Sequence, residues 1–381
     1  MAAPSTFMAR ALELAREALG TTSPNPAVGC VIVKGGSVIA EGYTQPPGGP
    51  HAEVVALRSA GDRARGATLY CTLEPCSHYG RTPPCASAII EAGIARVVYS
   101  LRDPDPRVDG KGAEMLRAAG IDVAEGDGAE ESAKALEGFI KHRTTGRPFV
   151  VVKYAASLDG KIAASSGDSR WVSGPQTLAW AHQMRTKIDA IMVGVSTVLI
   201  DNPQLTARPG GAEAQPHPLR VVVDSRGHTP ESAAVLRGPA RTLVATTAAA
   251  TAPWRAAMRT EGAEVFEGPT GEDGRVSLPA LLDELGRRGI LALLVEGGGV
   301  LHGSFFDQHL VDKVHAVIAP MIVGASAAPD AVAGRGAAYM RDAIRLRDLA
   351  VERLGEDVLV TGYPVYPGGI TAFEDRPEGE R

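Results

Sequence analysis

The chain has 381 residues, of which 44% are hydrophobic, and it carries 39 lysines and arginines against 44 aspartates and glutamates. This length indicates two globular domains rather than one. The net charge of −5 argues against a nucleic-acid binder, which usually has a strongly basic domain. A local cationic pocket for a phosphorylated small molecule stays open.

The cysteines and the first residues indicate a reducing compartment. Four cysteines are too few for a disulfide framework in so long a chain. Residues 1–10 lack a basic segment followed by an apolar core, and no run of about 18 apolar residues occurs. We therefore expect a cytoplasmic protein with reduced thiols, some of them on a metal, and with neither a signal peptide nor a membrane span.

Helices and strands alternate along residues 1–146. Apolar residues at helical spacing predict an amphipathic helix over residues 6–19. Gly35-Gly36 marks a hairpin turn between two strands. The expected strands cover residues 28–33, 38–40, 67–72, 96–100 and 122–124, and the further expected helices cover residues 51–59, 85–92, 112–119 and 130–142. This alternation predicts an α/β layer structure.

A turn-rich segment, residues 144–148, then breaks the pattern, and we place a domain boundary after Gly146. The second domain is expected over residues 147–369 and is also predicted to be α/β. Its expected strands cover residues 149–154, 190–193, 219–223, 242–245, 291–295 and 314–318, and its expected helices cover residues 175–186, 252–260, 278–288 and 300–308. Residues 370–381 are charged and poor in large apolar groups, which predicts a disordered tail.

A catalytic zinc site is predicted in the first domain. His51, Cys76 and Cys85 could supply the three protein ligands that leave a fourth position open for water. Glu53 lies two residues after the histidine, where it could reach that water without binding the metal. Zinc base deaminases use this arrangement, with the glutamate as general acid and base and the signature H-x-E followed by P-C-x-x-C.

The spacing departs from that signature, because eight residues separate the two cysteines. Cys85 would still lie at the N-terminus of a helix, where the helix dipole favours a thiolate. In the simplest alternative, the histidine caps a helix, the glutamate is solvated and the cysteines are small buried hydrophobes. The three elements in the required order favour the zinc site. Cys30 and Cys71 lie in apolar strands and are expected to be buried and structural.

The chain resembles the bifunctional riboflavin-biosynthesis deaminase/reductase family over nearly its whole length. The matching segments are Asn25-Pro-Ala-Val-Gly29, His51-Ala-Glu-Val54, Thr72-Leu-Glu-Pro-Cys-Ser-His78, Gly80-Arg-Thr-Pro-Pro-Cys85, Arg102-Asp-Pro-Asp-Pro106, Gly110-Lys-Gly112, Lys153-Tyr-Ala-Ala-Ser-Leu-Asp-Gly-Lys161, Ser169-Arg-Trp-Val-Ser173, Asp201-Asn-Pro-Gln-Leu-Thr206 and Val295-Glu-Gly-Gly-Gly299. The long gap between the cysteines is normal for this family.

The resemblance implies two folds and two reactions. It implies a cytidine-deaminase-like three-layer α/β/α domain, followed by an α/β domain similar to dihydrofolate reductase. The first reaction removes the C2 amino group of a diaminopyrimidinone that carries a phosphoribosylamino group. The second reduces the ribosyl unit to a ribityl chain. The resemblance further implies one zinc ion per chain, NADPH and a homodimer or higher homo-oligomer.

Site residues of the second domain follow from the same resemblance. It places Ala155, Trp171, Thr197, Asp201, Gly298, Gly299, Val300, Leu301, His302, Gly303 and Ser304 at the cofactor, and Ser169, Arg185, Leu205, Arg208 and Glu296 at the substrate. A forked guanidinium suits a phosphate monoester, although an isolated arginine is more often an ordinary surface residue.

Other candidates rest on local pattern. Lys153 is a charge in an otherwise apolar strand, which suggests a role near the substrate. Asp201 follows a β-branched run and is interpreted as the end of a strand, either serving ribose or proton transfer or capping a turn. Asn25 is a candidate for pyrimidine or ribose binding, and Arg81 and Lys111 are candidates for the substrate phosphate or are solvated charges.

Two other functions stay open at this point. The chain could be a nucleic-acid base deaminase with an accessory domain, although it lacks a basic, aromatic-rich stripe. It could also be a monofunctional deaminase whose second half serves dimerisation or regulation. The glycines after residue 295 argue against the latter, because glycines before a helix let a phosphate approach the backbone, although a simple tight turn is also possible. They do not complete a Rossmann fingerprint.

Overall fold

A computed structural model describes residues 3–79 and 83–369. The chain divides into two compact units, residues 1–146 and 147–381, which are treated separately below. None of the helices in the described ranges is long and apolar enough to cross a membrane.

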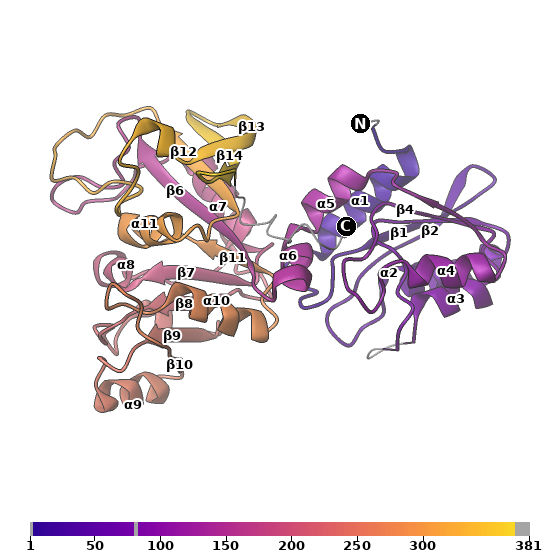
Figure 1. The fold of residues 1–381 in the computed structure, drawn as a ribbon, viewed down its shortest axis with the longest axis horizontal. Helices are drawn as coiled ribbons and strands as arrows, with labels where there is room; N and C mark the ends of the chain where they lie inside the picture. The colour runs from indigo at the N-terminus through magenta and orange to yellow at the C-terminus, as the bar shows by residue number, and fades with distance from the viewer. Residues whose placement is uncertain (1–2, 80–82, 370–381) are drawn as a thin grey trace. The chain divides into compact units, whose positions relative to one another are not determined.

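The first unit is built on a five-stranded sheet in the order β2-β1-β3-β4-β5 (Figure 1). Strand β1 pairs antiparallel with β2 and β3, and β3, β4 and β5 are parallel. The strands are β1 (Gly29–Lys34), β2 (Ser37–Tyr43), β3 (Thr68–Cys71), β4 (Arg96–Tyr99) and β5 (Asp122–Glu125), and the helices are α1 (Thr6–Ala18), α2 (Ala52–Ala60), α3 (Cys85–Glu91), α4 (Lys111–Ala118), α5 (Ala129–Ala135) and α6 (Glu137–Thr145), with a 3-10 turn at Gly61–Ala64.

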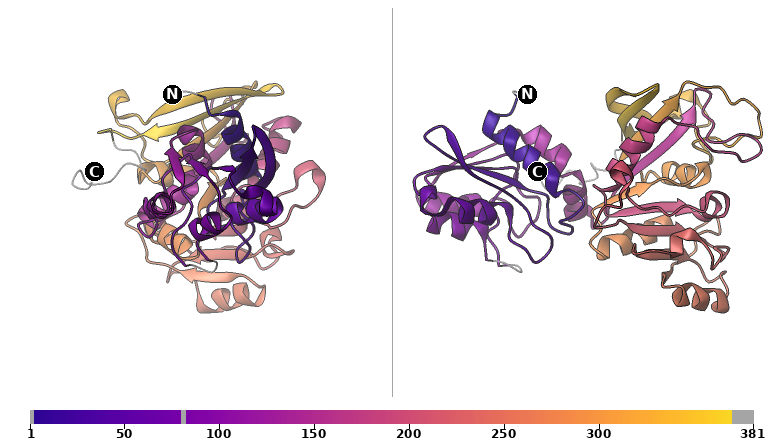
Figure 2. Two further views of the ribbon diagram at one scale, coloured as in Figure 1. Left: turned by 90° about the vertical axis from the view of Figure 1, so that its right-hand side faces the viewer. Right: turned by 180° about the vertical axis from the view of Figure 1, so that it is seen from behind.

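Helices cover both faces of this sheet, as Figures 1 and 2 show. On one face α1 packs on β1, where a side chain at Gly29 would overlap the Ala11 carbonyl. On the other face α2 lies against β2, where a side chain at Gly42 would overlap the Ala52 carbonyl. These glycines permit backbone contact between layers. The predicted three-layer α/β/α arrangement is confirmed.

The second unit contains a nine-stranded sheet in the order β10-β9-β8-β7-β11-β6-β12-β14-β13. The strands are β6 (Phe149–Ser157), β7 (Ala190–Gly194), β8 (Leu219–Val223), β9 (Thr242–Thr246), β10 (Glu264–Glu267), β11 (Ala292–Val295), β12 (Lys313–Ala319), β13 (Arg345–Leu354) and β14 (Asp357–Val365). The helices are α7 (Pro175–Arg185), α8 (Val195–Asp201), α9 (Ala252–Thr260), α10 (Leu278–Arg287) and α11 (Gly299–Asp307), with 3-10 turns at Pro209–Gly211, Ala234–Leu236 and Met340–Asp342. The strands from β10 to β12 are parallel, and the β13–β14 hairpin is added antiparallel.

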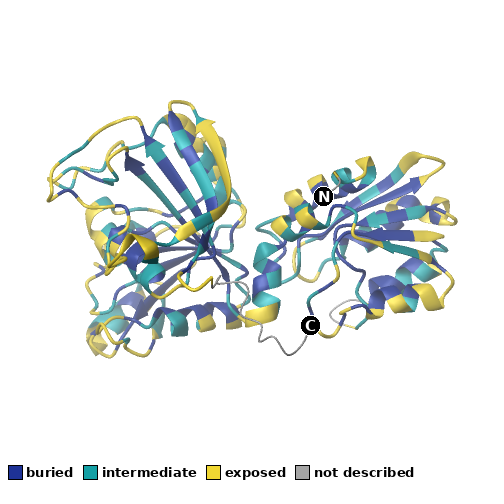
Figure 3. Cartoon of the chain, turned by 45° about the horizontal axis from the view of Figure 1, so that its top comes forward, coloured by how far each residue is buried: buried dark blue, intermediate teal, exposed yellow. Residues whose placement is uncertain are grey.

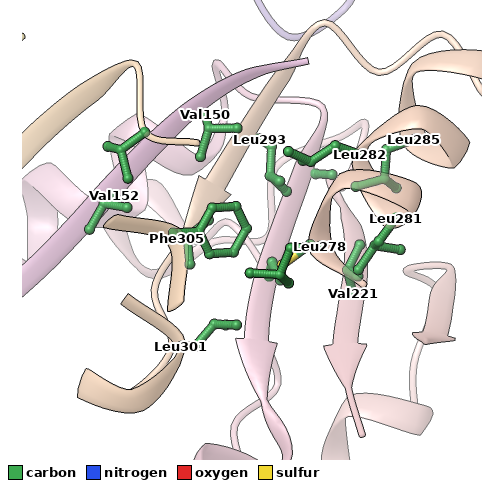
Figure 4. Packing of buried hydrophobic residues seen from close by; sticks show 14 of the residues in the cluster. Val150, Val152, Val221, Leu278, Leu281, Leu282, Leu285, Leu293, Leu301 and Phe305 are labelled. Carbon is green, nitrogen blue, oxygen red and sulfur yellow. The ribbon is translucent and has the colours of Figure 1, made fainter. Parts of the chain in front are cut away.

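Two apolar clusters bury the two faces of the parallel strands. One joins alternate residues of β6, β7, β8 and β11 to α10 and α11, and Figure 4 shows Phe305 of α11 beside Val150, Val152 and Leu293 within it. The other lies on the opposite face and includes Val198 of α8 and Met258 of α9. Both faces being covered explains why these strands are near-continuous apolar runs in the sequence.

The structure corrects several predicted elements. The helix expected over residues 130–142 is two helices, α5 and α6, because Leu136 leaves the helical conformation at φ −107° and ψ 13°. The run before Asp201 is not a strand but helix α8, of which Asp201 is the last residue. Strands β10, β13 and β14 were not predicted. The predicted tail, residues 370–381, lies outside the described residues.

Candidate active sites

Three elements of the first unit bring the predicted metal ligands together. His51 is the N-cap of α2, Cys76 follows β3, and Cys85 is the first residue of α3. The histidine Nδ1 lies 3.6 Å from the Sγ of Cys76 and 3.3 Å from the Sγ of Cys85. The candidate ligand atoms all lie within 4.8 Å of one another. Residues up to 34 positions apart in the chain therefore converge on one point.

The donor set fits a zinc ion. One imidazole nitrogen and two sulfurs are a ligand set of catalytic zinc sites. Hydrogen bonding from Cys85 lowers the pKa of the Cys76 thiol, and the same contact together with burial raises the pKa of Cys85, so the pair shares one proton and Cys76 is the sulfur that gives up its proton first. The thiolate is the form that binds metal. The backbone N–H of Cys85 also donates to the Cys76 sulfur at 3.3 Å, which holds the two segments together.

Glu53 completes this site from the first turn of α2. Its side chain is buried rather than solvated, and it interacts with the Cys85 side chain. Together with His51 and Cys76 it lines a cavity of about 230 Å³. Burial raises the pKa of its carboxyl. A buried carboxyl beside the ligands and open to a cavity is suited to exchanging protons with a small molecule there.

A second buried carboxylate, Glu74, organises the segment that carries Cys76. It accepts backbone hydrogen bonds from Asp103 at 3.3 Å, Gly110 at 2.9 Å and Ala113 at 3.1 Å. It thus ties the strand end after β3 to the N-terminus of α4. Glu74 was not among the predicted site residues, although its place in Leu-Glu-Pro-Cys, next to a metal ligand, was a signal.

The other candidates of the first unit have different outcomes. Asn25 lines the cavity, Lys111 does not, and Arg81 lies outside the described residues. Sequence reasoning missed further lining residues, namely Asp103, Asp105, Arg107, Phe139 and Arg143. The last two lie on α6, far from any motif.

The second unit has a larger cavity, of about 710 Å³, where the parallel strands end. Residues at or just after the carboxyl ends of β7, β8 and β11 line it, together with Lys153, Tyr154 and Ala155 from within β6. Open parallel α/β sheets bind their ligands at this edge. The position alone therefore makes this cavity the candidate cofactor and substrate site of the unit.

A buried charge cluster lies beside this cavity. Arg185 of α7 donates to the Glu296 carboxylate at 3.2 and 2.5 Å, and the amine of Lys153 lies 3.8 Å from the same carboxylate. Burial opposes ionisation of Glu296, but the neighbouring cations outweigh it and hold the pKa of this carboxyl below its usual value. Burial lowers the pKa of Lys153. The Oε1 of Glu296 is buried without a hydrogen-bond partner among the described residues. This oxygen could accept a hydrogen bond from a ligand in the cavity.

Most residues that the resemblance implied for this unit line the cavity. They are Ala155, Ser169, Thr197, Asp201, Glu296, Gly298, Gly299, Val300, Leu301, His302 and Ser304, and Lys153, the candidate from local pattern, lines it too. The residues outside the lining are Trp171, Arg185, Leu205, Arg208 and Gly303. Arg208 bonds Gln204 and Thr206, and the Trp171 side chain is exposed.

The start of α11 is open to the cavity and suits a phosphate. Gly298 caps the helix, and its N–H donates to the Thr197 hydroxyl at 3.2 Å. A side chain at Gly298 would meet little, whereas one at Gly299 or Gly303 would overlap the backbone of residues 330–333. Gly298 therefore leaves room for a ligand, and the other two permit close packing.

Both units match families of known proteins. Residues 1–101 match the cytidine and deoxycytidylate deaminase zinc-binding region, and residues 148–360 match the RibD C-terminal domain. The riboflavin biosynthesis protein RibD of Bacillus amyloliquefaciens is 41% identical over 359 residues, which is 94% of this chain and 95% of that protein. The chain belongs to the RibD family.

Solved structures of RibD proteins extend this agreement to the fold. Acinetobacter baumannii RibD superposes with a TM-score of 0.85 at 38% identity, covering 94% of this chain and 98% of that one. A deaminase/reductase of Thermotoga maritima superposes with a TM-score of 0.81 at 39% identity, with 94% and 98% covered. This RibD-family chain is a bifunctional riboflavin-biosynthesis enzyme, a zinc-dependent deaminase joined to an NADPH-dependent reductase.

Two loops that line the reductase cavity of this RibD-family chain were not predicted as part of a site. Asp224, Ser225, Arg226 and His228 of one loop and Arg275 of the other line the reductase cavity. The Asp224 carboxylate accepts from the backbone N–H groups of Gly227, His228 and Thr229 at 2.7–2.9 Å, which fixes the first loop. The hydroxyl of Ser225 accepts from Val276 at 3.0 Å and joins the two loops. The Asp-Ser-Arg-Gly turn after an apolar strand was the available signal.

Proposed function

We propose that the zinc triad and Glu53 carry out the deamination, and that the cavity at the strand ends of the second unit carries out the reduction. The Thermotoga relative is named a diaminohydroxyphosphoribosylaminopyrimidine deaminase and 5-amino-6-(5-phosphoribosylamino)uracil reductase. We assign the same substrates to this chain. The observation that carries the proposal is the convergence of His51, Cys76 and Cys85 beside the buried Glu53.

In the deamination, the protein's own part is proton transfer and positioning. Zinc held by the triad would lower the pKa of a bound water. Glu53 takes a proton from the attacking water as its oxygen bonds to C2 of the pyrimidinone. It then gives that proton to the C2 amine, whose bond to carbon breaks, so that ammonia leaves. Asn25, on the cavity wall, is placed to hydrogen-bond the ring or the ribose.

In the reduction, the charge cluster positions the substrate. A bound NADPH would supply the hydride for C1′ of the ring-opened ribosylamine, and the nitrogen on C1′ would gain a proton. Lys153, Glu296 and Ser169 line the cavity together, so the amine can donate to the substrate and the carboxylate can accept. The Ser169 hydroxyl donates to Asp201 at 3.0 Å and can accept from the substrate. Arg185 acts through Glu296, which it bonds, and keeps this carboxylate charged. The protein thus supplies orientation and electrostatics.

The sheet order suggests how the cofactor lies. Neighbouring strands are about 4.8 Å apart, so β6 and β8, three steps apart in the order β8-β7-β11-β6, are separated by roughly 14 Å. We place the substrate at Lys153 on β6, the diphosphate at Thr197 and Gly298, and the adenosine end at the loop after β8. Arg226 and Arg275 line this last part of the cavity and would face the 2′-phosphate that distinguishes NADPH from NADH.

Two further expectations belong to this proposal. A cytoplasmic location is supported by the four cysteines, all of them free. A homodimer through the second unit is supported by β13, an edge strand exposed along most of its length (yellow in Figure 3), with Leu349 and Val351 on its surface. Unpaired edge strands are common sites of association.

A crossed assay of two variants tests the assignment. Glu53→Gln should bind zinc but lose ammonia release by about 10²–10⁴-fold, the usual contribution of a general acid–base group, and should still oxidise NADPH with the deaminated intermediate. Lys153→Met should show the reverse pattern. Ammonia and NADPH are followed separately, and a zinc chelator should stop only the ammonia. Near-normal deamination by Glu53→Gln would sink the first assignment, and unchanged reduction by Lys153→Met the second.

A further inference from the structure

The deamination cavity is rich in carboxylates, although the proposed substrate carries a phosphate. The acids that line it are Glu53, Glu74, Asp103 and Asp105. A phosphate monoester bears close to two negative charges near pH 7, so binding here requires a nearby cation. Apart from histidines, the cations of the described lining are Arg107 and Arg143.

The guanidinium of Arg107 is already engaged by a carboxylate. Its Nε and Nη2 donate to the two oxygens of Asp105 at 2.9 and 2.6 Å, a forked pair. The Arg107 side chain is otherwise 60% exposed. This pairing neutralises Asp105, whose pKa falls to about 2 chiefly because of the hydrogen bond from Arg107. The positive charge of Arg107 is therefore already compensated by Asp105, although N–H groups on its two Nη atoms remain unused by this pair.

Arg143 is positioned differently. It projects from α6, and its guanidinium carbon lies 5.1 Å from the centre of the Phe139 ring, a cation–π contact with another residue of the cavity wall. Its Nη2 donates to the Pro24 carbonyl at 3.3 Å, beside Asn25. The side chain is only 24% exposed. Two contacts from different elements thus hold this guanidinium at the cavity.

Donor capacity remains on Arg143. Its Nε is buried and has no hydrogen-bond partner among the described residues. The nearest carboxylate oxygen, of Asp105, is 3.7 Å from it, too far for a hydrogen bond. Since Asp105 is already matched by Arg107, the group of these three side chains carries one net positive charge, and Arg143 supplies it.

We propose that Arg143 binds the phosphate group of the substrate in the deamination cavity and so selects phosphorylated pyrimidines. Donation from its free N–H groups to a phosphate oxygen is a charge-assisted hydrogen bond, among the stronger kinds in proteins. Phe139 and Pro24 preorganise the guanidinium, so little side-chain freedom is lost on binding. This inference rests on the assignment of the zinc cavity as the deamination site.

The test compares deamination of the phosphorylated substrate with that of its phosphatase-treated counterpart. Arg143→Ala should lower kcat/KM for the phosphorylated substrate by roughly 10- to 100-fold, as expected for loss of a hydrogen bond to a charged group, mainly through KM. The same variant should leave kcat/KM for the dephosphorylated compound unchanged. Inorganic phosphate should inhibit wild-type deamination competitively and inhibit the variant much less.

Matched variants separate phosphate binding from a structural role. Arg143→Lys should recover part of the loss, because it restores the charge without the fork. Arg58→Ala removes an exposed arginine of the same unit that does not line the cavity, and it should change neither substrate's kinetics. Zinc content and reduction of the deaminated intermediate report on folding in every variant.

Two results would overturn the proposal. Equal losses of kcat/KM with both substrates in Arg143→Ala, with or without loss of zinc, would show that Arg143 only supports the fold. An unchanged KM for the phosphorylated substrate would show that Arg143 does not bind the phosphate. If the wild-type chain deaminates neither compound, the assignment of the cavity itself has failed, which is a different result from failure of the arginine.

Discussion

A single buried carboxyl, Asp103, gives the deaminase unit a pH-dependent stability. Burial raises its pKa from 3.8 to about 7, whereas in the unfolded chain it titrates near the ordinary value. Between these two values the folded state binds the proton and the unfolded state does not. Stability therefore falls as pH rises through that window and stays lower above it.

Asp103→Asn should remove this loss, because its amide oxygen can still accept the 2.9 Å hydrogen bond from the N–H of Asp105. We expect the variant's unfolding temperature to exceed that of the wild type at pH 8, with a smaller difference at pH 5. Calorimetry measures these temperatures. The transition of the deaminase unit is the one whose temperature changes with zinc concentration, because zinc binds to this unit. Asp62→Asn, at an exposed aspartate, is the control. A gain of equal size at both pH values would contradict the prediction.

At the scale of elements, the zinc site depends on how closely α4 approaches the segment that carries Cys76. A side chain on Gly112, in the first turn of α4, would overlap the carbonyl oxygen of Pro75. Glu74 draws the same two segments together through its three backbone hydrogen bonds. The position of one metal ligand is thus set by a helix that supplies no ligand.

Gly112→Ala should therefore displace Cys76 and weaken zinc binding. Overpacking of this kind usually costs about 1–3 kcal/mol of stability. Zinc retained after dialysis against a chelator, together with ammonia release, measures the effect, while reduction should persist. Gly174→Ala is the control, since a side chain there makes only ordinary contacts. Full zinc retention in Gly112→Ala would show that the segment yields without disturbing the ligand.

The sequence pattern predicted the strands that are buried on both faces. It failed for elements that are mostly exposed, because their apolar residues do not follow the pattern of a buried strand or helix. The apolar strands β6, β7, β8 and β11 were found because both of their faces are buried. Strand β13 was missed because almost all its residues are exposed, so no alternation marks it. The β-branched run of α8 was misread as a strand, although only Val198 in it is buried.

Site residues were likewise predictable where they lie in short motifs and unpredictable where they depend on long-range contacts. His51, Glu53 and Cys76 lie in short motifs whose spacing indicates a zinc-dependent deamination site. Arg143 and the pairing of Arg185 with Glu296 depend on contacts between residues more than 100 positions apart, to which no local pattern refers. Folding makes these pairs, so they were beyond sequence reasoning from one chain.

At the scale of the whole molecule, the order of the strands underlies the proposal that Arg226 and Arg275 face the 2′-phosphate of the cofactor. Arg226 has no ion-pair partner among the described residues, and the Arg275 side chain is 54% exposed and 3.9 Å from Asp273. We expect the Arg226→Ala and Arg275→Ala double variant to bind NADP⁺ at least tenfold more weakly, since each charge-assisted hydrogen bond contributes about that factor, and to bind NAD⁺ unchanged.

Titration calorimetry with both dinucleotides measures this selectivity without turnover. Arg259→Ala, at an exposed arginine of α9 outside the cavity lining, controls for general loss of charge. Equal weakening of NADP⁺ and NAD⁺ would place these arginines at the diphosphate or in a structural role, and ammonia release should stay normal in every case.

The distribution of one residue type has an optical consequence for work on this chain. All three tryptophans, Trp171, Trp180 and Trp254, lie in the reductase unit. Trp254 donates to the carbonyl of Thr229 at 2.9 Å and packs on Gly227, within the loop assigned to the adenosine end. Tryptophan emission therefore reports on the reductase unit alone, with one indole next to the cofactor's far end. The deaminase unit has no tryptophan and does not contribute to this emission. Unfolding of the reductase unit and dinucleotide binding to it can therefore be followed in the intact enzyme.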